Sequence, residues 1–81
     1  MKAHVYVTLK RTVLDPQGQT IQNALKKLQY KGIEDVRQGK YFQLTIEDGT
    51  PADDARAEVE RIARDVLTNP VIEEFTCRLE D

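Results

Sequence analysis

The sequence predicts an α+β fold of the order β-α-β-α-β, with an antiparallel three-stranded sheet, a long bent second strand and two helices on one face, ferredoxin-like in character. Three segments alternate apolar and polar residues with a period of two, which is typical of half-buried strands. Two segments between them repeat apolar residues with helical spacing. Helices packed on one face of a sheet would bury all these apolar surfaces together. We therefore expect one domain, residues 1–81.

The first strand and the first helix are expected in the N-terminal third of the chain. Residues 3–9 carry apolar side chains at odd positions, so His4 is expected on the exposed side of the strand. Asp15 can cap a helix, and Pro16 fits the first helical position because no N–H donor is needed there. The apolar stripe of this helix comprises Ile21, Ala24, Leu25 and Leu28.

Residues 34–47 are expected to form one long second strand. Its apolar residues are all even-numbered and would face one way along a continuous strand: Val36, Phe42, Leu44 and Ile46. Gly39 lies between the cations Arg37 and Lys40, where a glycine favours a bend or bulge. A hairpin turning at Gln38-Gly39 is the alternative, but its first arm would be very short.

The second helix and the third strand complete the chain. Thr50 is expected to cap the helix, Pro51 to be its first residue, and Asn69-Pro70 to end it. Its apolar stripe comprises Ala55, Val59, Ile62, Ala63, Val66 and Leu67. Residues 71–79 alternate as a strand, with Val71, Phe75, Cys77 and Leu79 on one face. Cys77 is therefore expected to be a small core residue.

Composition narrows the classes of partner and compartment. The net charge of −2 gives no reason to expect nucleic acid. One cysteine excludes an internal disulfide and suits a reducing compartment. The chain starts directly with strand-like alternation rather than the apolar region of a signal peptide, and no run reaches the ~20 apolar residues of a membrane span. We expect a cytoplasmic protein that does not enter a membrane.

No residue pattern in the chain predicts catalysis. Nucleophilic catalysis needs a nucleophile beside a base, whereas His4 and Cys77 are single residues far apart in sequence. Residues 15–18, DPQG, lack the glycine spacing and the lysine of a phosphate-binding loop and favour a helix start instead. We expect no catalytic residue, no metal site and no cofactor on this chain, and a function based on binding.

Three motifs taken together identify a protein family more specifically than any one of them does. They are LDPQG at 14–18, VRQGK at 36–40 and VLTNPVIE at 66–73. Their order and spacing resemble the PurS family, the small subunits of phosphoribosylformylglycinamidine synthase, over nearly the whole chain. The first two motifs match the family's pattern in full. The third has Val66 in place of the family's first leucine, and Tyr30-Lys31-Gly32 departs from the more common order of leucine, glycine and tyrosine.

The resemblance implies a subunit of an enzyme of de novo purine biosynthesis, without an active site of its own. That enzyme converts formylglycinamide ribonucleotide, glutamine and ATP to formylglycinamidine ribonucleotide. A glutaminase subunit releases ammonia, and a large synthetase subunit, which binds ATP and Mg²⁺, adds the ammonia to the substrate. The small subunit, as a dimer, is expected to bridge the two and to help ammonia transfer.

The expected contacts with partner subunits follow the three motifs. They are Arg37, Gly39, Lys40, Asp15, Gln17 and Asn69. For the two cations, a solvated charge pair and a phosphate contact are the alternatives. The sequence leaves open whether the chain forms a dimer or a tetramer, the stoichiometry of the full complex, and which face meets which partner.

Two other classes of function remain as alternatives. One is a ferredoxin-like regulatory domain that binds a small ligand at a dimer interface. The other is an acyl-phosphate hydrolase, which needs an arginine in a glycine-rich phosphate loop after the first strand. Arg11 is followed by TVLDPQG, which does not provide that loop.

Overall fold

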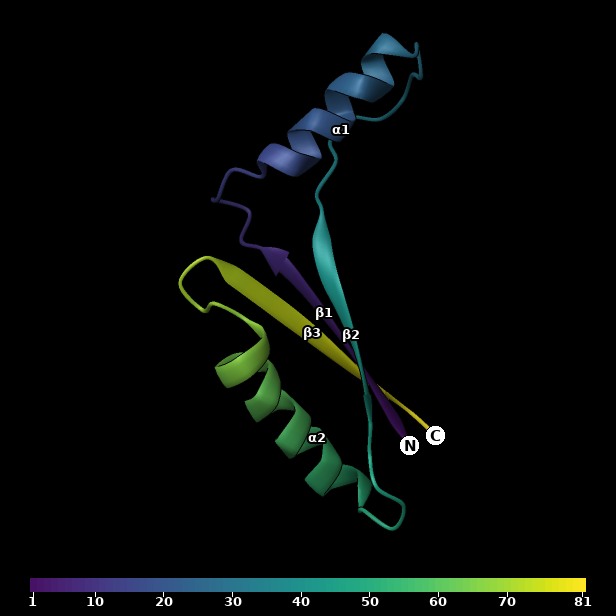
Figure 1. Ribbon diagram of the computed structural model, residues 1–81, viewed down its shortest axis with the longest axis vertical. Coiled ribbons are helices and arrows are strands. Elements are labelled where there is room, and N and C mark those ends of the chain that lie inside the picture. Colours follow the sequence, from purple (N-terminus) through teal and green to yellow (C-terminus); the bar gives the residue numbers. More distant parts are fainter.

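The computed structural model describes residues 1–81 and has the expected β-α-β-α-β order (Figure 1). The three antiparallel strands and two helices confirm the α+β fold class. The elements are β1 (Lys2–Leu9), α1 (Pro16–Lys27), β2 (Gly39–Thr45), α2 (Ala52–Ile62) and β3 (Glu73–Glu80), and a π-helical turn, Ala63–Leu67, extends α2.

The strand order β2-β1-β3 places β1 at the centre of the sheet. It pairs antiparallel with both neighbours, so that Val5 lies opposite Phe42 on one side and Cys77 on the other. The outer strands β2 and β3 therefore run parallel to each other. Joining two parallel strands requires a crossover from one end of the sheet to the other, and α2 provides it.

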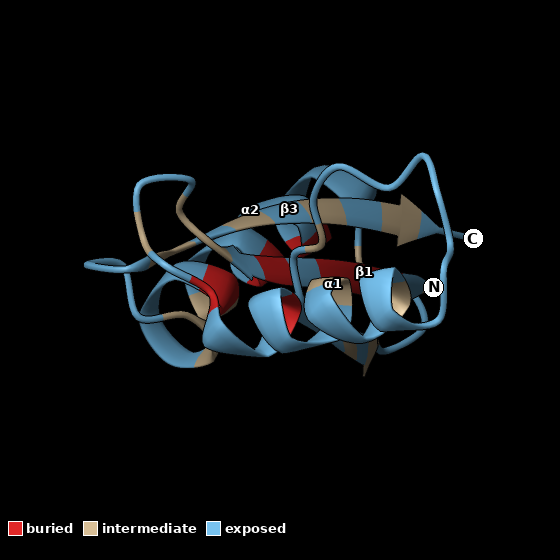
Figure 2. Ribbon diagram, turned by 90° about the horizontal axis from the view of Figure 1, so that it is seen from above, coloured by how far each residue is buried: buried red, intermediate tan, exposed pale blue.

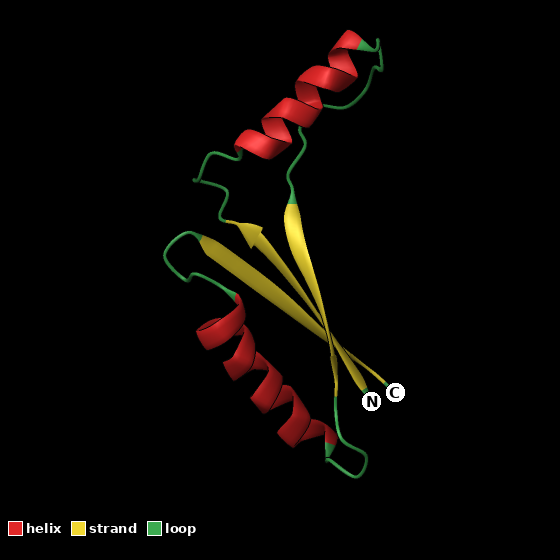
Figure 3. Ribbon diagram, in the orientation of Figure 1, coloured by secondary structure: helices red, strands yellow, loops and turns green.

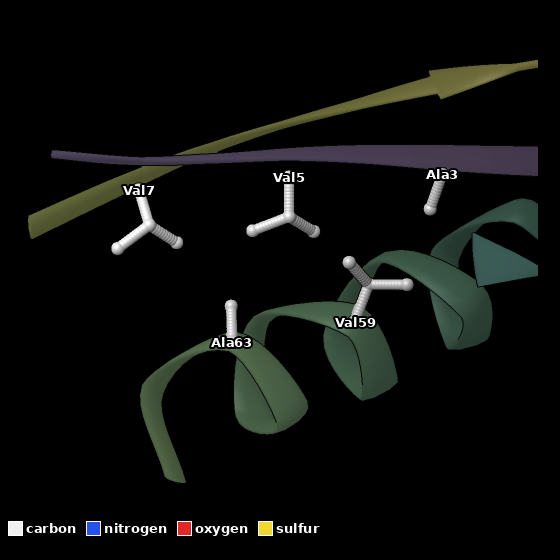
Figure 4. Close-up of a cluster of buried hydrophobic side chains, with 5 residues drawn as sticks. All are labelled: Ala3, Val5, Val7, Val59 and Ala63. Carbon is white, nitrogen blue, oxygen red and sulfur yellow. The ribbon is translucent and has the colours of Figure 1, made fainter. Parts of the chain in front are cut away.

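The core lies between β1 and the inner side of α2. The fully enclosed apolar residues are small. Five of them form one cluster, Ala3, Val5, Val7, Val59 and Ala63 (Figure 4), and Ala55 of α2 is also buried. Figure 2 shows that burial follows β1 along most of its length, while the rest of the chain is mainly exposed or half-buried. Cys77 is half-buried and packs against this core, as expected.

The expectation that both helices cover one face of the sheet is wrong for α1. Figures 1 and 3 show α2 alongside the strands and α1 projecting beyond the end of the sheet. Two residues of its apolar stripe, Ile21 and Leu28, are 42% and 69% exposed. The physical reason is topological: β1 and β2 are antiparallel neighbours, so the connection that contains α1 leaves and returns at the same end of the sheet.

The second strand is shorter than expected. It begins at Gly39, and residues 34–38 form no strand within this chain. Gly39 is therefore not a bend inside a strand, and its φ lies outside the left-handed region. It faces Thr8 in the register, and a Cβ at this position would lie 2.4 Å from the carbonyl oxygen of Val7. The glycine is needed for close approach of two backbones.

The helix ends show one confirmed and one wrong prediction. Asp15 caps α1 as expected, and Pro16 opens it. In α2 the N-cap position is held by Pro51, and the Thr50 hydroxyl donates instead to the carbonyl oxygen of Glu47, 2.9 Å away.

The third strand begins later than expected. β3 starts only at Glu73, so Val71 lies in the preceding turn and is exposed rather than on the apolar strand face.

Candidate subunit-contact site

The three motifs of the sequence meet at one end of the sheet, where they surround a cleft of about 190 Å³. The first motif contributes Gln17, the second Gly39 and Lys40, and the third Glu73. The full lining is Val7, Leu9, Gln17, Gln38, Gly39, Lys40 and Glu73. Segments some 20 to 30 residues apart in sequence therefore form one site, which the sequence alone did not show.

Asp15 joins the first motif to the second. One carboxylate oxygen, Oδ1, accepts from the backbone N–H of Gly18 at 3.0 Å, and the other, Oδ2, accepts from that of Gln38 at 2.6 Å. These two backbone donors, Gln38 first, hold the pKa of the Asp15 carboxyl below its usual value. Only 5% of the residue is exposed. Asp15 thus holds together two segments that contribute to the cleft, and its predicted role as a direct partner contact stays a prediction.

Two further contacts tie the same segments together. The guanidinium of Arg37 donates from Nη2 to the carbonyl oxygens of Lys10, at 3.1 Å, and Val13, at 2.9 Å. Gly18 lies so close to the second motif that a Cβ there would be 2.2 Å from the carbonyl oxygen of Val36. Arg37 therefore fixes the loop before α1, and the glycine of LDPQG is required by contact between backbones.

The third motif is held by Asn69 and Glu73. Asn69 donates its backbone N–H to Glu73 Oε1 at 2.7 Å, and its side-chain Oδ1 accepts from the backbone N–H of Val71 at 3.1 Å. Glu73 Oε2 lies 3.6 Å from Lys40 Nζ, which joins this motif to the second. The Lys40 side chain is 62% exposed, so this ion pair stabilises the fold only slightly and leaves the ammonium accessible. Glu73 was not among the predicted site residues, although it lies in the motif.

A second cleft, of about 250 Å³, lies next to the first. It is lined by Thr8, Leu9, Arg11, Asp35, Arg37 and Glu74. Two guanidinium groups and two carboxylates share its wall, so the cleft has no charge of one sign that would favour a simple anion or cation.

The sheet face opposite α2 carries a polar cluster centred on His4. His4 was expected at the surface but is only 7% exposed, because Tyr41 and Glu80 cover it from the neighbouring strands. Its Nε2 lies 3.1 Å from Glu80 Oε1, and its Nδ1 contacts the Tyr41 hydroxyl. The hydrogen bond from His4 lowers the pKa of the Glu80 carboxyl. The cross-strand register that pairs these residues was not predictable from one strand.

The chemistry available at the cleft is that of binding. Its polar groups are two side-chain amides, one ammonium and one carboxylate, with an apolar floor from β1.

The rest of the chain shows no further reactive group. Burial and the nearby Glu60 raise the pKa of the Cys77 thiol. The chain has no group of three His, Cys, Asp or Glu side chains placed to hold a metal ion. None of its helices is both long enough and apolar enough to span a bilayer.

Residues 2–81 match the family model described as PurS, phosphoribosylformylglycinamidine (FGAM) synthase. The PurS subunit of this synthase from Mycobacterium leprae is 48% identical over 79 residues, which cover 98% of this chain and 95% of that protein. The PurS subunit from Bacillus subtilis is 42% identical over 80 residues, which cover 99% and 93% of the two chains.

Solved structures show the same fold. A crystal form of B. subtilis PurS superimposes with a TM-score of 0.82 at 42% identity and covers 99% of this chain and 98% of that one. A chain in the structure of PurLQS from Thermotoga maritima has a TM-score of 0.86 at 30% identity, covering 95% and 93%. The second structure contains a PurS-like chain together with the subunits named L and Q.

Proposed function

Because the chain belongs to the PurS family of phosphoribosylformylglycinamidine synthase, we propose that it is the small subunit of that enzyme and acts in purine biosynthesis. As a dimer, it bridges a glutaminase subunit and a synthetase subunit in the cytoplasm. The synthetase subunit binds ATP and Mg²⁺, and this chain helps ammonia pass from one partner to the other. The observation that carries the proposal is the family match over residues 2–81, and the likeness to a chain of PurLQS supports the association.

The convergence of the three motifs supports one surface of the molecule as the site of this bridging role. Gln17, Gly39 and Lys40 line one cleft, and Asp15, Arg37 and Asn69 hold its walls through hydrogen bonds to backbone groups. We assign the cleft and its rim to contact with the synthetase subunit. Lys40 is the cation best placed for this contact, because its ammonium is largely exposed and its intramolecular partner lies at 3.6 Å.

The proposal is tested by reconstitution with the glutaminase and synthetase subunits. Glutamine-dependent formation of formylglycinamidine ribonucleotide should require this chain, while ammonia-dependent synthesis by the synthetase should not. A pull-down with this chain as bait should recover both subunits together. Glutamine-dependent synthesis at full rate without the chain would overturn the bridging role.

Lys40→Ala tests the assigned contact surface. At limiting concentration of the variant, glutamine-dependent synthesis should fall, because loss of a charge at the rim of an interface slows association. Ammonia-dependent synthesis should stay unchanged, and so should the melting temperature of the isolated chain. Lys26→Ala, which removes an exposed lysine of α1 outside the cleft, is the matched control. Equal activity of the two variants would remove Lys40 from the contact.

A further inference from the structure

A row of polar contacts crosses the whole sheet on the face opposite α2. His4 of β1 is its centre: Nε2 lies 3.1 Å from Glu80 Oε1 on β3, and Nδ1 contacts the Tyr41 hydroxyl on β2. The same hydroxyl donates to Gln43 Oε1, further along β2, at 3.3 Å. His4 is the single histidine of the chain and is buried. One imidazole therefore joins all three strands.

The donors and acceptors of this row fix where its protons lie. Gln43 Oε1 only accepts, so the Tyr41 hydroxyl gives its one proton to that atom. Toward His4 the hydroxyl oxygen is then an acceptor, and Nδ1 must donate to it. An ionised carboxylate also only accepts, so Nε2 must donate to Glu80. The three hydrogen bonds exist together only when both ring nitrogens carry a proton, which is the charged imidazolium.

A neutral imidazole does not complete the same row. If its proton is on Nε2, Nδ1 becomes an acceptor, and the Tyr41 hydroxyl must turn its proton away from Gln43 to meet it. If its proton is on Nδ1, the lone pair of Nε2 faces the Glu80 carboxylate, and two acceptors oppose each other. Each neutral tautomer therefore loses at least one of the three hydrogen bonds.

The titratable and charged groups around His4 come from both outer strands and from β1 itself. They are Glu80 and Arg78 of β3, Tyr41 of β2, and Lys2 and Tyr6 of β1. Burial and the two cations disfavour a charged imidazole, whereas the carboxylate favours it. Glu80 is in direct contact with the ring, where attraction is strongest, because Coulomb energy falls with distance. The hydrogen bond from His4, and after it the two cations, lower the pKa of the Glu80 carboxyl and so keep it ionised.

We propose that His4 is a pH-sensitive switch in the sheet: the imidazolium holds Glu80 and Tyr41 in one row of hydrogen bonds across the three strands, and loss of its proton breaks that row. The switch goes beyond the proposed function and does not depend on it. The single histidine is the group that changes charge near neutral pH, and the row gives that change a structural effect on both outer strands.

The row is complete within a window of pH that has two different limits. The lowered pKa of Glu80 means that its contribution is fully present above the ordinary value of 4.5 and is lost as pH falls through the folded value. The contribution of a paired imidazolium is fully present below about pH 6.5, the ordinary value of a histidine, and is lost as pH rises further. Between these limits both partners carry their charges.

Nuclear magnetic resonance of the single imidazole tests the proton positions in the isolated full chain. At pH 6 the two ring nitrogens of His4 should have similar chemical shifts, as in an imidazolium, and they should become different as pH rises. Glu80→Gln keeps a hydrogen-bond acceptor but removes the charge. The imidazole of this variant should therefore lose its second proton about one pH unit lower than that of the wild type.

Glu74→Gln is the matched control. Glu74 lies on β3 but opposite Thr8, about 13 Å along the strand from the residue opposite His4. This distance exceeds the screening length of about 8 Å at physiological salt, so the His4 transition should stay near its wild-type pH. Equal shifts in the two variants would overturn the proposal. So would a wild-type imidazole that carries only one proton at pH 6.

Urea unfolding tests the effect of the switch on the sheet. The Glu80 side chain is 51% exposed, so Glu80→Gln is expected to fold. Its loss in the folded-to-unfolded ratio, relative to wild type, should be about 10-fold greater at pH 6 than at pH 9, which corresponds to the shift of one pH unit. Glu74→Gln should show no such difference between the two pH values. A loss from Glu80→Gln that is equal at both, or greater at pH 9, would overturn the proposal.

Discussion

Asp15 is the residue on which the geometry of the cleft depends most. Its two carboxylate oxygens accept from two different backbone segments, at Gly18 and Gln38. An asparagine could keep the first bond through its carbonyl oxygen, but its NH₂ group would then face the Gln38 N–H, and two donors would oppose each other. A serine could cap the helix but would not reach Gln38. Either substitution should separate α1 from the second motif.

The lowered pKa of Asp15 predicts how its contribution changes with pH. A carboxyl whose pKa is lower in the folded than in the unfolded state stabilises the fold above its ordinary pKa, near 3.8, and loses this effect as pH falls through the folded value. The difference in unfolding free energy between wild type and Asp15→Asn should be largest at pH 7 and smaller at pH 3. Urea unfolding at both pH values measures it, with Asp15→Ser as a second non-titrating variant. A difference that is the same at both pH values would contradict the prediction.

Gly39 is required by space rather than by backbone angle. A side chain there would meet the carbonyl oxygen of Val7 at 2.4 Å and Thr8 Cγ2 at 2.8 Å. Because the first contact is with backbone, relief would require β1 and β2 to separate locally. Gly39→Val should lower the unfolding free energy by about 1–3 kcal/mol.

Gly49 offers a control for this substitution. It lies in open space with φ near +87°, a conformation that asparagine tolerates better than most residues. Gly49→Asn should therefore change the unfolding free energy by less than about 1 kcal/mol. Equal costs for the two substitutions in urea unfolding would show that the contact with Val7 does not matter.

The two helices differ because their connections differ. The crossover from β2 to β3 carries α2 along the sheet, where Val59 and Ala63 meet Val5 and Val7 (Figure 4). The connection from β1 to β2 has no such constraint, and α1 lies beyond the strands. Stability of the isolated chain should therefore depend on the stripe of α2.

Val59→Ala tests this dependence. Val59 is enclosed in the core, so the substitution should lower the unfolding free energy by about 2 kcal/mol through lost burial and a residual cavity. Val66→Ala makes the same chemical change on the exposed π-helical turn and should cost less than about 0.5 kcal/mol. Both are measured by urea unfolding at one protein concentration. Similar values for both would mean that α2 does not form the core of the chain in solution.

The whole molecule is more extended than a compact chain of its length. Its radius of gyration is 16.2 Å, whereas a compact chain of 81 residues has about 12 Å. Only 9 of the 81 residues are buried, so the apolar surface within one copy gives a thin core. Association should therefore supply part of the stability.

The melting temperature should accordingly rise with protein concentration, because a dimer that unfolds to monomers is stabilised by mass action. A series from about 1 to 100 μM, followed by circular dichroism, measures the shift. A wild-type melting temperature that is independent of concentration would indicate that the chain unfolds as a monomer, and sedimentation at the same concentrations checks this.

The sequence by itself determined the elements and the family. Period-two alternation identified the three strands, helical spacing identified the two helices, and Asp15-Pro16 marked where α1 begins, because these signals are local in the chain. The three motifs pointed to the right family without any knowledge of where they lie. Only the tertiary structure decided that these motifs meet at one cleft, that His4 is covered by Tyr41 and Glu80, and that α1 leaves its own sheet. These features depend on strand order and register, which join residues far apart in sequence. An apolar stripe on a helix predicts that the helix favours burial, but it does not determine where the connections of the chain will place that helix.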